Sequence, residues 1–171
     1  SQQGACFKST YPAPIHVITL LYLNRPDQHY QGLFGCREDL RPGDFPYTAD
    51  KNSDEFQAKA ETEIKNLYIK DCDVTGGYGT GAVMGCLWNF FQEDYGEIHL
   101  ENCHVTGTVM SCGTGGGVGG IVTTVKDSSF QGTVNSTGEA GGIAGEAYYI
   151  DRCYVRGEVS GSGNVGGIGG M

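Results

Sequence analysis

The chain is poor in basic residues and in proline. Only 11 of its 171 residues are Lys or Arg, against 20 Asp or Glu, which gives a formal net charge of −9. Nucleic acids and anionic membrane surfaces attract clustered Lys and Arg, so neither is expected as a partner. Proline occurs five times, and aromatic residues make up 11% of the chain. These values argue against a disordered Gly/Pro-rich linker.

Long apolar runs and the short motifs of common enzymes are also missing. The longest apolar stretch, residues 15–23, is much shorter than the roughly 20 residues that a membrane-spanning helix needs. We interpret it as a buried strand. The chain contains no HExxH, GxSxG or CxxC motif, and its glycines lack the neighbours that a phosphate-binding loop requires. We therefore predict no membrane insertion, no catalytic residues, no cofactor and no bound metal.

Glycine is in excess, with 29 residues of 171, more than double the usual share of about 7%. A phrase recurs in the later two thirds of the chain: IKDCDVTG at 69–76, LENCHVTG at 100–107, VKDSSFQG at 125–132 and IDRCYVRG at 150–157. A glycine-rich phrase follows each copy: GAVMG at 81–85, GGIVT at 119–123, GGIAG at 141–145 and GGIGG at 166–170. Repeats of this length indicate stacked supersecondary units.

The aligned copies show the period of a β-strand. From the column that contains Cys72, Cys103, Ser128 and Cys153, apolar residues fall at every second position, as in a strand with one buried face. The preceding apolar column lies three positions earlier, which breaks the alternation and predicts a bend. We predict an all-β fold: a β-solenoid of about four repeats over residues 63–171. Residues 1–62 are expected to form a mixed N-terminal cap with a short helix near 53–62.

One polar column alternates in charge from copy to copy. Its members are Lys70, Glu101, Lys126 and Asp151. If the copies stack at the β-ladder spacing of about 4.8 Å, each charge lies between two opposite ones. Exposed pairs contribute only about 0.2–1 kcal/mol each, so this inter-coil charge ladder would mainly fix the register. Chance alternation among four residues is the alternative interpretation.

Seven cysteines are many for a cytosolic chain, and an extracellular setting permits disulfides. The candidate pairs are Cys6 with Cys36, Cys72 with Cys103, and Cys86 with Cys112, which leaves Cys153 as a free thiol. The alternative is a column of unoxidised buried cysteines that act as small apolar side chains. The sequence leaves both interpretations open.

The two phrases resemble the glycine-rich GLUG-type repeat of bacterial secreted and surface proteins, in which I-x-x-C-x-V-x-G-x-V precedes G-G-I/L-x-G. Residues 64–171 carry the resemblance. The resemblance implies a solenoid fold, an extracellular or cell-surface location, and the role of a stalk or ligand-binding module. The first copy departs from the pattern, with Ala82 and Val83 in place of the expected GGI and an insertion, LWNFF, at 87–91.

We therefore predict an extracellular structural or adhesive repeat protein without enzyme activity. It would serve in surface display or as a filament subunit that assembles end to end through its uncapped repeat end. The expected partners are other copies of the chain, other surface proteins or glycans. The alternative is a carbohydrate-binding or polysaccharide-cleaving module that uses Asp71, Asp73, Asp127 and Asp151 of neighbouring coils, with Arg152 and Arg156 as charge stabilisers. The same carboxylates could instead hold calcium, which prefers oxygen ligands.

Two further features are candidate sites. An aromatic patch could be a carbohydrate-stacking platform or a loop packed over one end of the repeats; its members are Trp88, Phe90, Phe91 and Tyr95. Asn135 begins the triplet Asn-Ser-Thr, the acceptor pattern for N-glycosylation in a secretory route.

Overall fold

The computed structural model describes residues 15–37, 62–87 and 97–171. Over these ranges the chain forms strands joined by turns and has no helix. The strands are β1 (His16–Thr19), β2 (Tyr22–Arg25), β3 (Cys36–Arg37), β4 (Thr62–Gly76), β5 (Thr80–Gly81), β6 (Met84–Leu87), β7 (Ile98–Ser111), β8 (Gly115–Gly116), β9 (Gly119–Lys126), β10 (Ser129–Ser136), β11 (Ala140–Gly141), β12 (Ala144–Asp151), β13 (Tyr154–Ser160) and β14 (Val165–Gly166). The predicted all-β class is confirmed. Among the described residues, no helix of a length and apolarity suited to crossing a membrane was found.

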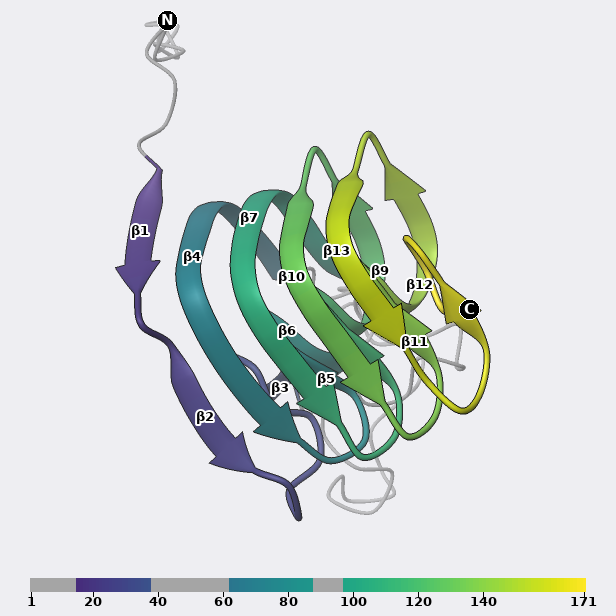
Figure 1. Cartoon of the computed structure of the whole chain (residues 1–171). Helices are drawn as coiled ribbons and strands as arrows, with labels where there is room; N and C mark the ends of the chain where they lie inside the picture. Colours follow the sequence, from purple (N-terminus) through teal and green to yellow (C-terminus); the bar gives the residue numbers. More distant parts are fainter. Residues whose placement is uncertain (1–14, 38–61, 88–96) are drawn as a thin grey trace, which may run out of the picture.

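The strands pair in parallel, and the same strand types recur along the chain. The curved strands β4, β7, β10 and β13 lie side by side (Figure 1). A second run contains β6, β9 and β12, and the short strands β5, β8, β11 and β14 form a sheet of their own. Within each run, a strand therefore lies next to the equivalent strand of the neighbouring repeat; the last repeat contributes β13 and β14 but no strand to the second run.

Equivalent positions of the last three repeats lie directly beside one another. Val105 pairs with Phe130 and Phe130 with Val155, while Gly132 lies between Gly107 and Gly157. Residues 25 positions apart also touch through their side chains, as His104 and Ser129 do. The predicted columns are thus confirmed for these three repeats.

The first repeat is shifted from the predicted frame. Leu100 lies opposite Ile64, and Val105 lies opposite Ile69. The offset between the first two repeats is 36 residues, as between Asn66 and Asn102, so the columns that placed Cys72, Val74 and Gly76 with Cys103, Val105 and Gly107 were wrong. The segment IKNLYI at 64–69 fits the frame of LENCHV at 100–105: an apolar residue, a charge, an asparagine and a second apolar residue.

A local irregularity in β4 changes the register in which the rest of this strand pairs with β7. Asp71 has a left-handed φ of 56°, and the register shifts between Ile69 and Cys72. Beyond this bulge, Val74 lies opposite Val109. The predicted alignment of the glycine-rich phrases was also wrong in the second repeat, because Gly116, and not Gly119, pairs with Gly81 and Gly141.

The predicted bend is confirmed as a corner of left-handed residues. These residues form one column, which we call the corner column: Asn66 (φ 57°), Asn102 (φ 52°), Asp127 (φ 48°) and Arg152 (φ 49°). Asn and Asp tolerate this conformation better than most residues because their short polar side chains bond locally. The chain therefore turns at the same place in each repeat.

The core consists of apolar side chains that point inward from the strand runs. Its largest fully buried members are Phe130, Ile69, Ile98, Leu100, Ile143, Val74, Val83, Val105, Val109, Val118, Val122 and Val125. Successive strands contribute one member each to columns such as Val74, Val109 and Val134, all fully buried. Stacking of neighbouring repeats therefore creates the core.

The described part of the predicted cap joins the same sheet. Ile18 of β1 pairs with Ile69, and Leu23 of β2 pairs with Val74. Leu20 has a left-handed φ of 62° and lies between β1 and β2, where it matches the bulge at Asp71.

Most of the predicted helix at 53–62 lies outside the described residues. Thr62 begins β4, so the expected boundary between 62 and 63 lies within that strand.

Candidate functional site

The end of the structure formed by the last repeat shows apolar residues that inner repeats bury. Ile150, Val155 and Val159 pack against the core but are only half-buried, whereas Phe130 and Val134 in the preceding repeat are fully buried. Within the described residues, β13 pairs only with β10, while residues 168–171 bond to the outer side of β12 at Ala144, Gly145 and Ala147. Along β13 this end is therefore an open sheet edge over an incompletely covered core.

The opposite end has the same character. Ile18, Leu21 and Leu23 of the first strands pack against the core and are half-buried. Within the described residues, β1 and β2 pair only with β4, and Val17 and Leu20 are 60% and 73% exposed. Two open, partly apolar edges therefore lie at opposite ends of the row of strands (Figure 1).

The outward side of the curved strands carries a hollow. Its central line, which we call the outer column, runs across four neighbouring strands: Tyr68, His104, Ser129 and Tyr154. The small Ser129 lies between two large rings, and a half-open hollow of about 230 Å³ lies over it. Val105, Thr106 and Gln131 complete its lining.

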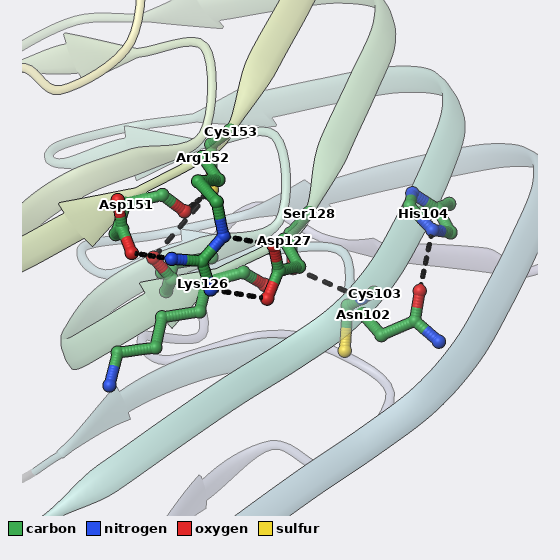
Figure 2. A network of polar contacts seen from close by, with 10 residues as sticks. Asn102, Cys103, His104, Lys126, Asp127, Ser128, Asp151, Arg152 and Cys153 are labelled. Carbon is green, nitrogen blue, oxygen red and sulfur yellow. Dashed lines mark hydrogen bonds and ion pairs between the residues drawn. The ribbon is translucent and has the colours of Figure 1, made fainter. Parts of the chain in front are cut away.

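Hydrogen bonds on both ring nitrogens fix the imidazole of His104. Nδ1 lies 2.9 Å from Ser129 Oγ, and Nε2 lies 2.9 Å from Asn102 Oδ1. Asn102 Nδ2 in turn donates to Asn66 Oδ1 at 2.7 Å. The ring of Tyr68 meets the imidazole edge to face, with centroids 6.4 Å apart. Figure 2 shows the contact between Asn102 and His104 and its place beside the corner column.

The aspartates considered for catalysis do not all lie together in the structure. The guanidinium of Arg152 donates from Nε to Asp127 Oδ1 at 2.6 Å and from Nη2 to Asp127 Oδ2 at 2.7 Å, and it also pairs with Asp151 (Figure 2). The hydrogen bonds from Arg152 lower the pKa of Asp127. Asp71 and Asp73 lie on β4 and Arg156 lies on β13, so they do not join this cluster.

The clustered carboxylates therefore already share an arginine as their ion-pair partner, and they make a poor acid–base pair. Among the described residues no three His, Cys, Asp or Glu side chains are grouped so that they could hold a metal ion. The arrangement tightens the corner between the last two repeats, because Asp127 and Arg152 come from neighbouring repeats.

The charge ladder has one different member from the one predicted. Lys65, and not Lys70, lies opposite Glu101, and their charged groups are 3.2 Å apart. Lys70 instead lies opposite Thr19 of β1. The shift of the first repeat explains the error. Glu101, Lys126 and Asp151 occupy neighbouring positions of one column as expected, and the ammonium of Lys126 lies 5.6 Å from the centroid of the Tyr149 ring.

A buried carboxyl group was not found from the sequence. Glu146 is 3% exposed; its Oε1 accepts from Tyr78 at 3.4 Å and from Thr114 at 3.3 Å, while its Oε2 has no hydrogen-bond partner. Burial raises the pKa of Glu146. The Thr114 hydroxyl also lies 3.1 Å from Glu139. No repeat column singles out Glu146, since the equivalent residue of the preceding repeat is Ile121.

The two disulfide predictions that the structure tests were wrong. Cys72 lies opposite Gly107, while Cys103 lies opposite Leu67, so these two cysteines are not neighbours in the ladder. The free thiols among the described side chains are Cys72, Cys103, Cys112 and Cys153, which excludes the pairing of Cys112 with Cys86. Cys6 and the side chain of Cys36 lie outside the described residues; the backbone of Cys36 pairs with that of Cys86.

These thiols should differ sharply in reactivity. Burial raises the pKa of Cys72 and of Cys103 to about 11, whereas Cys112 is exposed. Because the thiolate is the reactive form, we expect iodoacetamide at pH 8 to label Cys112 at least tenfold faster than Cys72 or Cys103 in the folded protein. Peptide mass spectrometry over a time course measures the rates. In guanidinium chloride the three rates should converge; equal rates in the folded protein would contradict the buried positions.

The remaining predicted sites are only partly placed. The aromatic patch of Trp88, Phe90, Phe91 and Tyr95 lies outside the described residues. Asn135 is exposed on β10, opposite Met110 and Ser160 of the neighbouring strands, so its amide is accessible on the outer side.

The functional interpretation therefore depends on geometry: two open edges, one outer hollow and an arginine-bridged corner. Compared with known proteins, the chain matches no family model, no curated protein and no solved structure.

Proposed function

We propose that the chain is a β-solenoid of the GLUG-repeat kind, an extracellular structural protein whose copies stack end to end. The observation that carries the proposal is the matching pair of open edges. Two columns end in half-buried apolar residues at both ends: Ile18 and Val155 in one, Leu23 and Val159 in the other. A second copy placed on the last repeat would continue both of these columns.

The register of such a junction follows from the columns. Ile18 belongs to the column of Ile69 and Val105, which ends at Val155. Leu23 belongs to the column of Val74, which ends at Val159. A parallel pairing of β1 and β2 of one copy with β13 of another therefore brings Ile18 beside Val155 and Leu23 beside Val159. Burying these side chains supplies the driving force, at about 25 cal/mol per Å² of apolar surface.

The bulge at Leu20 does not prevent this pairing. Strand β4 has an equivalent bulge at Asp71 and still pairs with the unbulged strand β7 on both sides of it. The strands β1–β2 would meet the unbulged strand β13 in the same manner. The strands β1, β2 and β13 contain no proline, one of the devices that natural proteins use to prevent strands from pairing at an edge. Two polar residues of the first edge follow inward columns, because His16 lies opposite Leu67 and Arg25 lies opposite Gly76; both are exposed.

The test is to place a charge in the proposed junction. For Val155→Lys we expect the concentration-dependent growth of the wild-type chain to disappear, because an inward lysine at the edge would be buried without a partner. Sedimentation velocity over a hundredfold range of protein concentration, with negative-stain imaging, measures the assembly.

The matched control is Glu158→Lys, which puts a lysine on the outward side of the same strand and should leave assembly within about twofold of wild type. Far-ultraviolet circular dichroism checks that both variants fold. A wild-type chain that stays monomeric over the whole range, or equal assembly by Val155→Lys, would refute the proposal.

A further inference from the structure

We propose that the hollow over Ser129 is a binding site for an uncharged polysaccharide segment that lies across the strands. This inference is independent of end-to-end stacking. The site is formed by side chains from four neighbouring repeats, so its shape depends on the register of the stack. Its described lining contains none of the aspartates that the sequence singled out.

The first argument is the placement of rings. Tyr68 and Tyr154 stand at the two ends of the outer column, three strand intervals apart, which is about 14 Å at the usual strand spacing. His104 and Ser129 lie between them. Tyr154 is 63% exposed, so its ring is available to a ligand. Rings spaced along a line suit a chain of pyranose units, whose C–H faces pack on aromatic faces.

The second argument is the polar lining. Ser129, Thr106 and Gln131 place two hydroxyls and one amide at the hollow, groups that both donate and accept hydrogen bonds. Sugar hydroxyls also do both, so this set is complementary to them. The two hydrogen bonds on its ring nitrogens hold His104 in place, which reduces the entropy lost when a ligand packs on it.

The third argument is charge. Among the described residues, the lining comprises no Asp, Glu, Lys or Arg, and the chain as a whole carries a net charge of −9. A polyanion such as a sulfated glycan or a nucleic acid would be repelled at long range by this net charge, although one cation, Arg156, lies beside the hollow opposite Gln131. The volume of about 230 Å³ is below the range of about 300–1,000 Å³ typical of enclosed small-molecule pockets. An open hollow of this size suits part of a longer chain.

The experiment is titration of the full chain with oligosaccharides. The probes are the hexamers of cellulose, xylan, mannan and chitin, with a heparin hexasaccharide and an oligogalacturonate as charged probes. We expect at least one neutral hexamer to bind, with affinity rising with length from the monosaccharide, and with chemical-shift changes in ¹H–¹⁵N spectra centred on Thr106, Ser129 and Gln131. No binding by any neutral hexamer at millimolar concentration would overturn the proposal, as would binding of the charged probes alone.

Variants separate ring stacking from other contributions. Tyr154→Ala should weaken binding of the best neutral hexamer at least tenfold, while Tyr154→Phe should keep it within about threefold because the ring remains. Tyr149→Ala is the matched control: Tyr149 is 54% exposed on β12 and lines no part of the hollow, so binding should not change. Sedimentation run in parallel separates binding from assembly. An unchanged affinity in Tyr154→Ala, or an equal loss in Tyr149→Ala, would contradict the assignment.

Discussion

Replacing Gly132 with alanine should cost about 3 kcal/mol or more of the free energy of unfolding. Gly132 has a φ of +150°, and a Cβ built on it would lie 1.8 Å from the carbonyl oxygen of Gly107 and 2.8 Å from the carbonyl carbon. Both atoms belong to the backbone of a neighbouring strand, so no side chain can turn away to make room. The strands would have to separate where β10 pairs with β7. Backbone strain and overpacking therefore act together.

Urea denaturation, or the melting temperature by differential scanning calorimetry, measures this loss. For a chain of this length, each kcal/mol corresponds to about 2–4 °C, so we expect a fall of about 6–12 °C. Gly167→Ala is the matched control, because a Cβ at Gly167 meets nothing within 4 Å, and its effect should stay within about 0.5 kcal/mol. A loss below about 1 kcal/mol for Gly132→Ala would mean that the glycine column is not needed for close approach of the strands.

The same glycine column shows how much of the fold could be predicted. Three glycines recur at a constant spacing and all have positive φ: Gly107, Gly132 and Gly157. Their alignment can therefore be predicted from the sequence. Gly76 matches them in the sequence but lies opposite Ser111. Its Cβ would instead meet Thr80 and Gln31. The sequence therefore shows where a glycine is, but not which close contact requires a glycine at that position.

The frame of the first repeat could not be decided by matching letters alone. IKDCDVTG resembles the later phrases more closely than IKNLYIKD does, yet the structure uses the second. In the structure the corner residues fix the frame: Asn66 and Asn102 both adopt left-handed φ and bond to each other. Asp71 adopts a left-handed φ as well, so a search for residues that tolerate this conformation would have offered both frames without deciding between them.

The candidate site depended on that frame. With the letter-based alignment, Asp73 would lie beside His104; in the structure the neighbour is Tyr68. A carboxylate beside histidine favours acid–base chemistry, whereas a tyrosine beside histidine makes an aromatic surface. Shifting the first repeat thus changes the predicted chemistry of the site. The buried carboxyl group of Glu146 had no comparable signal, because its neighbours come from turns outside the recurring phrases.

Replacing Phe130 with alanine should destabilise the protein by about 3–5 kcal/mol. Phe130 is fully buried and is the largest side chain in the core. Its column otherwise holds smaller side chains, those of Ile18, Ile69, Val105 and Val155. Gly117 leaves room for the larger ring, because a Cβ on Gly117 would lie 2.3 Å from Cγ of the ring. Truncation leaves a cavity that this crowded backbone cannot close.

Urea denaturation measures the loss, and two variants make the argument specific. Phe34→Ala removes the same ring from a position that is 53% exposed, and it should cost within about 0.5 kcal/mol. Phe130→Val restores the residue typical of the column and should recover part, but not all, of the loss, because a valine cannot reach the space over Gly117. If Phe130→Val is as stable as wild type, the neighbouring repeats can approach one another to fill the space. The spacing of the repeats would then be set by the side chains between them rather than by the backbone ladder.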